Sequence, residues 1–446
     1  MASTSIHRTP SSAGNRRKFT MSVWCKKHSS EQMNFIGTGG SGDQNHIQFD
    51  GSDRFQMRHY AGGQTILVNT KALLKDPNAW YHLVCSVDTT QSTASNRIKL
   101  YVNGELAELN DTTYPSQNYD WNFNDAEIHY IGRRAHSNAY LFDGIMSHFH
   151  WIDGTAYDAS PFGSIDSTTG QWKINISPSV TYGTNGFFLF KDNASLTDQS
   201  GNNNNFTLSA GTLTKTEDAP SNNWVTFNSI SNNANATLSN ANTVVSYHTT
   251  AWKRAIASLG NNSGKWYWEV KRASSGTPYI KTGMIEELGQ TATMPSHEHH
   301  ADNQYGWAWY VNGGTLELRT NQAVISGFSQ SDLGNTTIAN GDIICVALDL
   351  DNGRLHARKN NGSWLKSGNP TAGSGGYSIA NFSANTKFYF PACSVYNATT
   401  AQHNFGNGFF GTTAVSSAGT NASGLGIFEF DVPAGFTALT TKGLNL

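Results

Sequence analysis

The chain has little charge, few cysteines and no long apolar run, and each shortage excludes a class of protein. Charged residues make up 14% of its 446 residues and the net charge is −2, so it lacks the basic surface that binding to nucleic acid requires. No segment approaches the roughly 20 apolar residues of a membrane-spanning helix. Residues 1–20 lack the apolar core of a signal peptide, which predicts synthesis in a cytoplasm without secretion.

The cysteine and glycine content narrows the fold class. The four cysteines form no Cys-X-X-Cys pair, which argues against a zinc knuckle and favours buried free thiols over disulfides. The 43 glycines and many Asn, Ser and Thr residues separate short runs of β-branched and aromatic residues, which is typical of an all-β protein. Only residues 69–80 have helical character, which Pro77 ends.

Apolar and polar residues alternate along many of the short runs, as they do in strands with one buried face. Residues 19–25 follow this pattern, and so do residues 98–102. The second run is followed by Asn103-Gly104, a pair that tolerates the positive φ values of a type I′ turn. The sequence therefore predicts a β-hairpin at this point.

The stretch SGKWYWEVK, residues 263–271, carries three aromatic residues in a row. Such a run suggests either a platform that stacks on a sugar or the interior of a fold. Alternation places Trp266, Trp268 and Val270 on one face of a strand. We interpret that face as the one buried against a facing sheet, because two tryptophans and a valine make a core face.

Four segments of the first half, in this order and spacing, resemble the laminin-G-like, concanavalin-A-like jelly roll. They are NAWYHLVCSVD (78–88), NRIKLYVNGEL (96–106), EIHYIGRR (127–134) and YLFDGIMSHFHWIDG (140–154). The resemblance covers residues 1–160. The opening RTPSSAGNRRKFTMSVW is similar to the start of this domain in phage fibre and other virion surface proteins, especially marine ones.

Four segments of the second half resemble a SPRY domain, another antiparallel β-sandwich, over residues 223–411. They are SGKWYWEVK, NQYGWAWYVNGG, GDIICVALDLDNGRLHARKNNGSW and FYFPACSVYNATTAQHNFG. Residues 161–222 form a strand-containing bridge, which either adds strands to the first sandwich or only connects the domains. Residues 412–446 form a C-terminal segment that is similar to the end of the same phage fibre group. We therefore predict an all-β chain of two tandem concanavalin-A-like antiparallel sandwiches, laminin-G-like and then SPRY.

Paired carboxylates would be the sign of a glycanase, since concanavalin-like folds include such enzymes. A retaining glycosidase holds two carboxyl groups about 5 Å apart, one as nucleophile and one as acid. The nearest pattern is FEFDVPA, in which Glu429 and Asp431 fit but Ala434 stands where a second glutamate is needed. The sequence therefore predicts no catalytic residues and no enzyme.

The loop PSHEHHADNQ, residues 295–304, gathers imidazoles and carboxylates of the kind that bind zinc or another transition metal. It lacks the helical spacing of H-E-x-x-H, so we interpret it as a solvated polar loop and predict no metal site within the chain. A metal shared between subunits is the alternative. His297 and His299 point the same way on an extended chain. Together with Asp302 they are candidate ligand contacts.

Oxygen donors for calcium are present in loops and at strand ends of the first half. Their spacing matches no closed ligand set, so the sequence predicts no cofactor. A structural calcium ion stays an open alternative, because jelly rolls of this type often hold one. The donors are Asp43, Asn45, Asn124, Asp125 and Asp143.

The loop TTYPSQNYDWNFND, residues 112–125, combines aromatic rings with amide and carboxylate groups, which is what sugar recognition needs. The alternative, which we favour, is that the rings close one end of the sandwich. As candidate ligand-binding residues this loop contributes Tyr114, Tyr119, Trp121, Asn124 and Asp125.

The resemblance implies a non-catalytic virion surface protein, a fibre or decoration, that is assembled in the host cytoplasm. Its expected partners are other virion proteins and a host-surface glycan or protein, with many copies raising the avidity of weak contacts. A homo-oligomer is expected, with a trimer as in many fibres, although no coiled-coil heptads enforce it. An architectural decoration protein that binds only virion proteins is the first alternative. A glycan hydrolase of concanavalin-like fold is the second.

Overall fold

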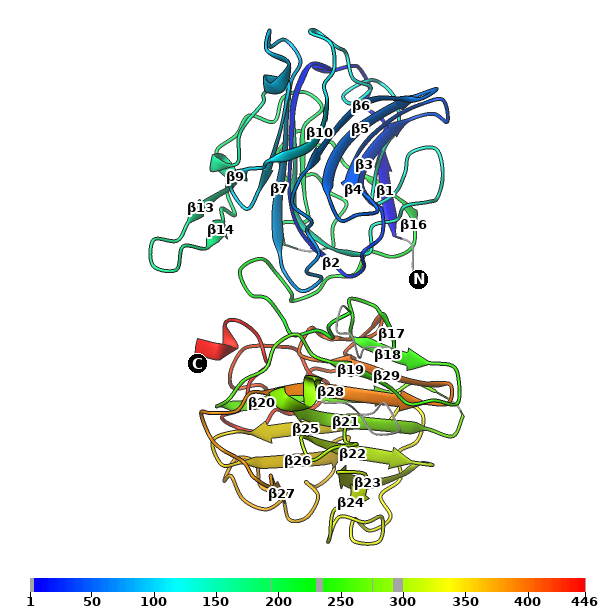
Figure 1. The fold of residues 1–446 in the computed structure, drawn as a ribbon, viewed down its shortest axis with the longest axis vertical. Helices are drawn as coiled ribbons and strands as arrows, with labels where there is room; N and C mark the ends of the chain where they lie inside the picture. The colour runs from blue at the N-terminus through cyan, green and yellow to red at the C-terminus, as the bar shows by residue number, and fades with distance from the viewer. Residues whose placement is uncertain (1–3, 193, 230–235, 275, 292–299, 446) are drawn as a thin grey trace. The chain divides into compact units, whose positions relative to one another are not determined.

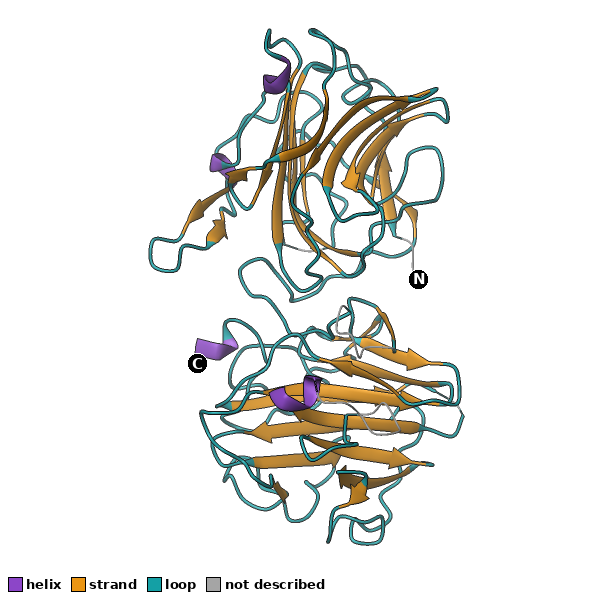
Figure 2. Ribbon diagram, in the orientation of Figure 1, coloured by secondary structure: helices purple, strands orange, loops and turns teal. Residues whose placement is uncertain are grey.

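The computed structural model describes residues 4–445 apart from 193, 230–235, 275 and 292–299. It divides into two compact units, Met1–Lys215 with Ala219–Ser221 and Asn222–Leu446 with Thr216–Asp218. Strands dominate both units (Figure 2). The described helical elements are one turn of α-helix and three short 3-10 turns, and no described helix could cross a membrane. They are α1 (Glu287–Thr291), η1 (Ala94–Asn96), η2 (Ser160–Phe162) and η3 (Gly443–Asn445).

The first unit is a sandwich of two antiparallel sheets (Figure 1). The eight-stranded sheet has the order β10 (Leu109–Thr113), β6 (Gln64–Thr70), β5 (Phe55–Ala61), β4 (Asp43–Phe49), β3 (Met33–Gly39), β11 (His129–Ile131), β1 (Ser5–Arg8) and β16 (Thr207–Ala210). The six-stranded sheet has the order β15 (Phe187–Leu189), β12 (Gly144–Asp153), β2 (Lys18–Lys27), β7 (Tyr81–Asp88), β8 (Ile98–Val102) and β9 (Glu105–Leu106).

Alternation along these strands builds the first core. In β2 the side chains of Phe19, Met21, Val23 and Cys25 are fully buried between the sheets. The hairpin prediction is confirmed, because β8 pairs with β9 across Asn103 and Gly104, whose φ values are 49° and 89°. Each fully buried large apolar side chain contributes roughly 1.5–3 kcal/mol, so this core supplies most of the unit's stability.

The predicted helical turn at residues 69–80 is wrong. β6 ends at Thr70, and residues 71–80 contain no helix. Leu74 instead inserts its side chain into the core, and its backbone N–H donates to the Asp53 carbonyl oxygen at 2.8 Å. Burial of this leucine outweighs the weak helical propensity of the segment.

The bridge contributes strands to the first unit, which resolves the alternative that the sequence left open. β15 pairs with β12, and β16 pairs with β1. Between β12 and β15 in the chain, β13 (Gly163–Ile165) and β14 (Trp172–Ile174) form a small two-stranded sheet. Bridge side chains, among them Phe162, Trp172 and Tyr182, cover the outer face of the six-stranded sheet.

The second unit is also a sandwich. Its seven-stranded sheet has the order β17 (Thr237–Ser239), β18 (Val244–Tyr247), β29 (Thr399–Asn404), β20 (Lys265–Arg272), β25 (Ile343–Asp349), β26 (Arg354–Lys359) and β27 (Tyr377–Ser378). Its six-stranded sheet has the order β19 (Lys253–Ile256), β28 (Tyr389–Tyr396), β21 (Tyr279–Glu286), β22 (Gly306–Asn312), β23 (Thr315–Thr320) and β24 (Ala323–Val324). A separate hairpin joins β30 (Phe409–Phe410) and β31 (Thr413–Ala414).

The second core confirms the interpretation of SGKWYWEVK, because Trp266, Trp268 and Val270 lie between the two sheets. The other face of β20 is buried as well, which the sequence did not predict. Tyr267 packs there in a separate apolar cluster formed with the C-terminal segment. Beside it, the Glu269 carboxylate accepts the backbone N–H groups of residues 429 and 430, both at 2.9 Å. The C-terminal segment is thus a third layer over the seven-stranded sheet.

All four cysteines are buried free thiols, as the sequence predicted. The structure is therefore all-β, with two tandem sandwiches of antiparallel strands.

Candidate functional site

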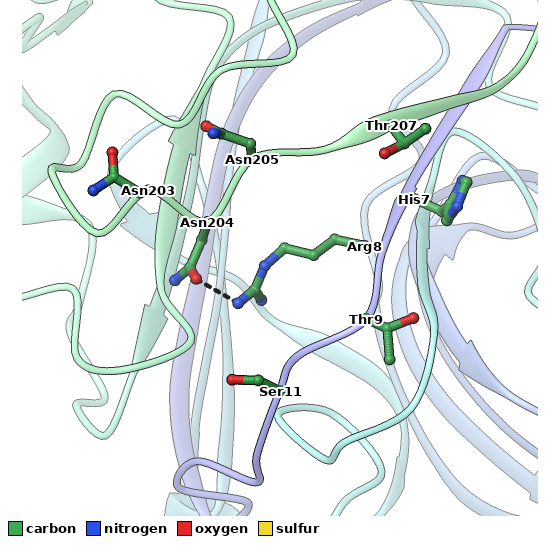
Figure 3. A pocket seen from close by; sticks show the side chains of 8 residues that line it. All are labelled: His7, Arg8, Thr9, Ser11, Asn203, Asn204, Asn205 and Thr207. Carbon is green, nitrogen blue, oxygen red and sulfur yellow. Dashed lines mark hydrogen bonds between the residues drawn. The ribbon is translucent and has the colours of Figure 1, made fainter.

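A polar hollow of about 360 Å³ opens at the edge of the eight-stranded sheet in the first unit. It lies where β16, the last strand of that sheet, runs antiparallel to β1 with His7 opposite Thr207. Figure 3 shows its lining, which comes from the end of β1 and from the turn before β16. The lining residues are His7, Arg8, Thr9, Ser11, Asn203, Asn204, Asn205 and Thr207.

The turn before β16 is held by a buried carboxylate. Asp198 accepts the backbone N–H groups of Phe188 at 2.8 Å and of Ser200 and Asn204 at 2.9 Å each. The Asn204 amide nitrogen also donates to the carbonyl oxygen of Gly186 at 2.8 Å. These bonds fix the turn, so the side chains that line the hollow stand on a rigid base.

Asn203 stands at the tip of this turn. Its φ of 60° lies in the left-handed region, which asparagine tolerates better than most residues. The residue is exposed, and its side-chain amide forms no hydrogen bond with any residue that the structure describes. It therefore offers one carbonyl oxygen and two N–H donors to a ligand.

Arg8 reaches across the hollow, where its guanidinium donates to the Asn204 side-chain oxygen (Figure 3). Partial burial lowers the pKa of Arg8 from its ordinary value, against the opposing effect of the Asp198 charge. The guanidinium remains a cation at physiological pH. Its other N–H groups form no hydrogen bond to a described side chain, so they are available to a ligand oxygen.

His7 stands on the opposite side of β1 from Arg8, since neighbouring residues of a strand point to opposite faces (Figure 3). Its ring lies 5.6 Å from that of Tyr130, and the Arg133 guanidinium lies 3.9 Å above the Tyr130 ring. The buried Nδ1 atom of His7 has no hydrogen-bond partner in the described part of the chain. A stack of His7, Tyr130 and Arg133 therefore lies next to the hollow, and the His7 Nδ1 atom in it has no described hydrogen-bond partner.

The donor set decides what the hollow can do. Amides, hydroxyls and a guanidinium hydrogen-bond a ligand rich in hydroxyl groups, as sugars are. No aspartate or glutamate is among its described lining residues, so it lacks the carboxylate pair of a glycosidase and the hard oxygen ligands of calcium.

The predicted aromatic loop lies elsewhere and is built into the core. Trp121 is 0% exposed and, with Phe123, packs against the core residue Phe19. Tyr119 is half-buried, and its hydroxyl lies 3.2 Å from the His59 Nδ1 atom. Tyr114 also packs against this core. A fully buried Trp121 offers no ring face to a sugar, so the loop closes the sandwich, the alternative that we favoured.

The two polar candidates of the same loop are structural. Asn124 is buried, donates its amide to the Asn15 carbonyl oxygen at 2.8 Å, and accepts from the Trp151 indole N–H at 2.7 Å. Asp125 forms an ion pair of 2.9 Å with Arg16. Both side chains therefore have partners that hold the loop in place.

The second predicted loop is only partly described. His297 and His299 lie outside the described residues. Asp302 is 1% exposed, and the neighbouring His300 Nδ1 lies 2.8 Å from the Ser394 Oγ atom on β28. The described end of this loop is therefore buried on a sheet, and its interpretation as solvated surface is corrected for residues 300–302.

The carboxylates of FEFDVPA hold turns of the C-terminal segment. Glu429 accepts the backbone N–H and the hydroxyl of Ser416. Asp431 accepts the Thr420 backbone N–H at 2.6 Å and the Thr420 hydroxyl at 2.8 Å. These bonds lower the pKa of Asp431 below its ordinary value, so it stays an ionised acceptor.

The other ionisable donors are not gathered into a metal site. Among the described residues, no three histidine, cysteine, aspartate or glutamate side chains are placed to hold one ion. Asp43, one of the oxygen donors considered for calcium, lies 2.7 Å from the His59 Nε2 atom. Asp143 lies 4.0 Å from His28, and burial raises the pKa of its carboxyl.

Comparison with known proteins places the first unit in a fold class. Residues 3–159 match the family model of the concanavalin A-like lectin/glucanases superfamily, which is less than half of the chain. No curated protein sequence matches the chain.

Among solved structures, the SPRY domain of human HERC1 is 12% identical, with a TM-score of 0.27 over 36% of this chain and 87% of that one. The TRIM65 PSpry domain is 16% identical, with a TM-score of 0.30 over 40% of this chain and 87% of that one. The heptameric SAP-like pentraxin of Limulus polyphemus is 10% identical, with a TM-score of 0.30 over 48% and 91%. All three scores lie below 0.5, so no conclusion about function rests on them.

Sequence reasoning missed the hollow. Its two contributors, residues 7–11 and 203–207, are about 200 positions apart and meet only because β1 pairs with β16. The asparagine run 202–205 was the available signal, although the same letters also describe an ordinary turn.

Proposed function

We propose that this chain is a non-catalytic binding protein whose first unit holds a glycan in the polar hollow. The observation that carries the proposal is the lining: unengaged donors and acceptors of Asn203 and Arg8 stand on a rigid turn, with no carboxylate among them. The match of residues 3–159 to a superfamily of lectins and glucanases supports a carbohydrate ligand over other hydroxyl-rich molecules.

The proposed setting is the surface of a virion, where the chain would serve as a fibre or decoration and bind a host-surface glycan. Its support is the likeness of the opening and closing segments to phage fibre proteins. Assembly in the host cytoplasm, contacts with other virion proteins and a homo-oligomer, as in trimeric fibres, belong to the same proposal. Several copies of one small site would raise a weak affinity by avidity.

The absence of catalysis is part of the proposal. It is supported by the engagement of Glu429 and Asp431 in turns and by the polar, carboxylate-free lining of the hollow. Incubation of the purified protein with host polysaccharide should release no reducing sugar. Release of reducing sugar would overturn this part of the proposal.

A glycan array with three proteins tests the site: wild type, Asn203→Ala, and Asn96→Ala as a matched control. Asn96 is an exposed asparagine in η1, outside the lining of the hollow. Loss of the Asn203 amide removes a hydrogen bond worth about 1 kcal/mol, so affinity for the bound glycan should fall about fivefold. Asn96→Ala should bind like wild type.

Two outcomes would contradict the proposal. If wild type bound no glycan on the array or on whole host cells, carbohydrate recognition would be wrong. If wild type bound but Asn203→Ala and Arg8→Ala both kept full affinity, the ligand would lie outside the hollow. Melting curves of the variants separate lost binding from lost folding.

A further inference from the structure

A row of basic and aromatic side chains runs from the hollow across the outer face of the eight-stranded sheet (Figure 1). The strand neighbours of core residues point outward, because side chains alternate between the two faces of a sheet. Register across β1, β11, β3, β4 and β5 places five outward residues opposite one another: His7, Tyr130, Gly37, His46 and Arg58. Neighbouring strands lie about 4.8 Å apart, so the row spans about 19 Å. It begins in the hollow, because His7 is part of the lining.

The loop after β11 adds two arginines to this row. Its backbone is fixed by the hydrogen bond from the Arg134 N–H to the Ala139 carbonyl oxygen, at 3.0 Å. A Cβ atom on Gly37 would lie 3.5 Å from the Ala135 backbone nitrogen, so the loop lies within van der Waals reach of the sheet. Arg133 and Arg134 therefore stand on a fixed support beside the row.

Three arginines of this face each lie over a tyrosine ring. The distances from the guanidinium carbon to the ring centre are 3.9 Å for Arg133 and Tyr130, 5.0 Å for Arg134 and Tyr140, and 5.4 Å for Arg58 and Tyr60. All three arginines are partly exposed. The rings hold the guanidinium planes in place, and the N–H groups remain along the edges of those planes.

The three guanidiniums lack acidic partners in the described part of the chain. Arg58 forms no hydrogen bond or ion pair there, and its buried Nε atom has no partner. The Arg133 side chain donates only to the Ala135 carbonyl oxygen, at 3.3 Å. The Arg134 side chain donates to the Gln44 side-chain oxygen at 2.8 Å. No described carboxylate forms an ion pair with any of the three.

The titration of His46, in the middle of the row, reports the sign of the local charge. Burial, followed by four basic side chains, lowers the pKa of His46 to about 3. Those side chains are Arg134, Arg58, His136 and His59. Burial and then Arg134 also lower the pKa of the exposed His136. The cations of this face therefore repel a further positive charge, and the same field attracts an anion.

The arrangement favours an acidic sugar chain over nucleic acid. Single-stranded nucleic acid stacks its bases on free aromatic faces, whereas guanidiniums already lie over the tyrosines of this face. Sulfate and carboxylate groups need only the guanidinium edges, which bind them through paired N–H bonds. One arginine on a tyrosine is ordinary surface chemistry. Three beside one row, without a described carboxylate partner, make a positive strip on a chain whose net charge is −2.

We propose that the glycan of the hollow is an acidic chain, sulfated or carboxylated, that continues from the hollow along this row. Arg58, Arg133 and Arg134 pair with its anionic groups, while Asn203 holds one end of the chain in the hollow. The inference rests on the proposed function, because it extends the same ligand from the same hollow. It adds the charge class of that ligand and a length of several sugar units.

Calorimetric titration of the full chain tests the row with three hexasaccharides: a sulfated galactan, a polygalacturonate and a neutral galactan. At low salt, at least one acidic probe should bind about tenfold or more tightly than the neutral one, and this advantage should shrink as ionic strength rises. The two acidic probes separate sulfate from carboxylate as the preferred group. A single-stranded thymidine 12-mer, the nucleic-acid arm, should bind more weakly than the better acidic sugar.

Arg58→Gln is the cleanest variant, since the Tyr60 ring is the only described contact of the Arg58 guanidinium. It should weaken acidic binding by about fivefold and leave neutral binding unchanged, and Arg58→Lys, which keeps the charge, should retain most of the affinity. Arg58→Gln combined with Arg133→Gln should lose about tenfold or more. Lys75→Gln removes one charge from the exposed loop after β6 and, as the matched control, should bind like wild type.

Two results would overturn the inference and leave the proposed function standing. One is a neutral probe that binds as tightly as both acidic probes. The other is full acidic preference in Arg58→Gln and in the double variant, while Asn203→Ala weakens every sugar. Equal binding of the thymidine 12-mer would assign the row to nucleic acid and also overturn the inference. Absence of binding to every sugar would overturn the proposed function itself. Melting curves identify a variant that does not fold, and Arg133→Gln alone then decides.

Discussion

The two aromatic regions of this protein have opposite roles. In the first unit, Trp121 and Phe123 come from a long loop and are completely buried. In the second unit, Tyr279 and Tyr396 come from central strands, and with Trp252 they remain partly exposed. The loop rings have the composition of a ligand platform in the sequence, yet they are the buried ones.

The difference lies in what covers each region. The loop 112–125 closes one end of its sandwich, so its rings fill space that water would otherwise enter. Among the described residues, the end of the loop that holds His300 packs on β28 of the outer face, whereas the outer face of β20 carries the C-terminal layer. Exposure follows from tertiary cover and not from whether a ring sits in a loop or in a strand.

The largest expected effect tests the buried side of this comparison. Trp121→Ala removes a fully buried indole, so the first unit should lose about 3–5 kcal/mol of unfolding free energy. Denaturant unfolding, with melting of each unit followed separately by calorimetry, measures this loss. A loss below about 1 kcal/mol would mean that the ring is not packed and that the loop is open to ligands after all.

Lys281→Met tests the exposed region through pH, because the buried Lys281 Nζ atom lies 4.2 Å from the centre of the Trp252 ring. The folded-state pKa of about 6 lies below the ordinary value of 10.5, so the unfolded chain binds more protons between these limits. Wild-type stability therefore rises from pH 6 toward 10.5 by up to about 1.4 kcal/mol per pH unit from this group, and the variant should lose that rise. Melting curves from pH 7 to pH 9 measure the difference. Parallel profiles would contradict a buried amine.

Glu269→Gln tests the covered face of β20. The Glu269 carboxylate accepts four hydrogen bonds. Glutamine would place an NH₂ group against some of these donors, so the free energy of unfolding of the second unit should fall by about 1–3 kcal/mol.

Burial raises the pKa of Glu269 to about 7, from 4.5. The stabilisation that Glu269 gives to the folded state is therefore fully present below about pH 4.5. It decreases as the pH rises to about 7, and above that pH it no longer changes. The variant should lack that fall when melting curves are compared across this window. An unchanged pH profile would show that Glu269 titrates normally and that the C-terminal layer does not seal it.

Trp252→Ala should have the smallest effect on stability, about 1–2 kcal/mol, because the ring is partly exposed and loses contacts with two tyrosines. Denaturant unfolding and calorimetry, as for Trp121→Ala, compare the loss of unfolding free energy at the two tryptophans directly. Equal losses in both variants would remove the distinction between the two regions.

Local pattern was enough to predict the sheets but not their outer layers. Alternation in residues 19–25 and 266–270 and the Asn103-Gly104 turn predicted strands, core faces and a hairpin correctly. These signals act over a few residues. The C-terminal layer over Tyr267 and Glu269 depends on contacts about 160 positions apart, which alternation does not encode.

The candidate sites were harder for the same reason. Trp121 and Asn124 have the composition of a sugar site, and only their packing shows that they hold the sandwich closed. The hollow joins His7 and Arg8 to a turn about 200 residues away, and the Lys281 Nζ atom meets the rings of Trp252 and Tyr310 from two other segments. Each of these groupings is produced by strand pairing, so no single stretch of sequence carries it.

The most direct test of the account compares Asn203→Ala with Trp121→Phe in a titration of the glycan that wild type binds best. Trp121→Phe keeps an aromatic ring in the core, so the unit should fold with reduced stability. Asn203→Ala should lose about fivefold in affinity, and Trp121→Phe should bind like wild type wherever it is folded. Full affinity in Asn203→Ala together with lost affinity in folded Trp121→Phe would contradict the placement of the ligand in the hollow.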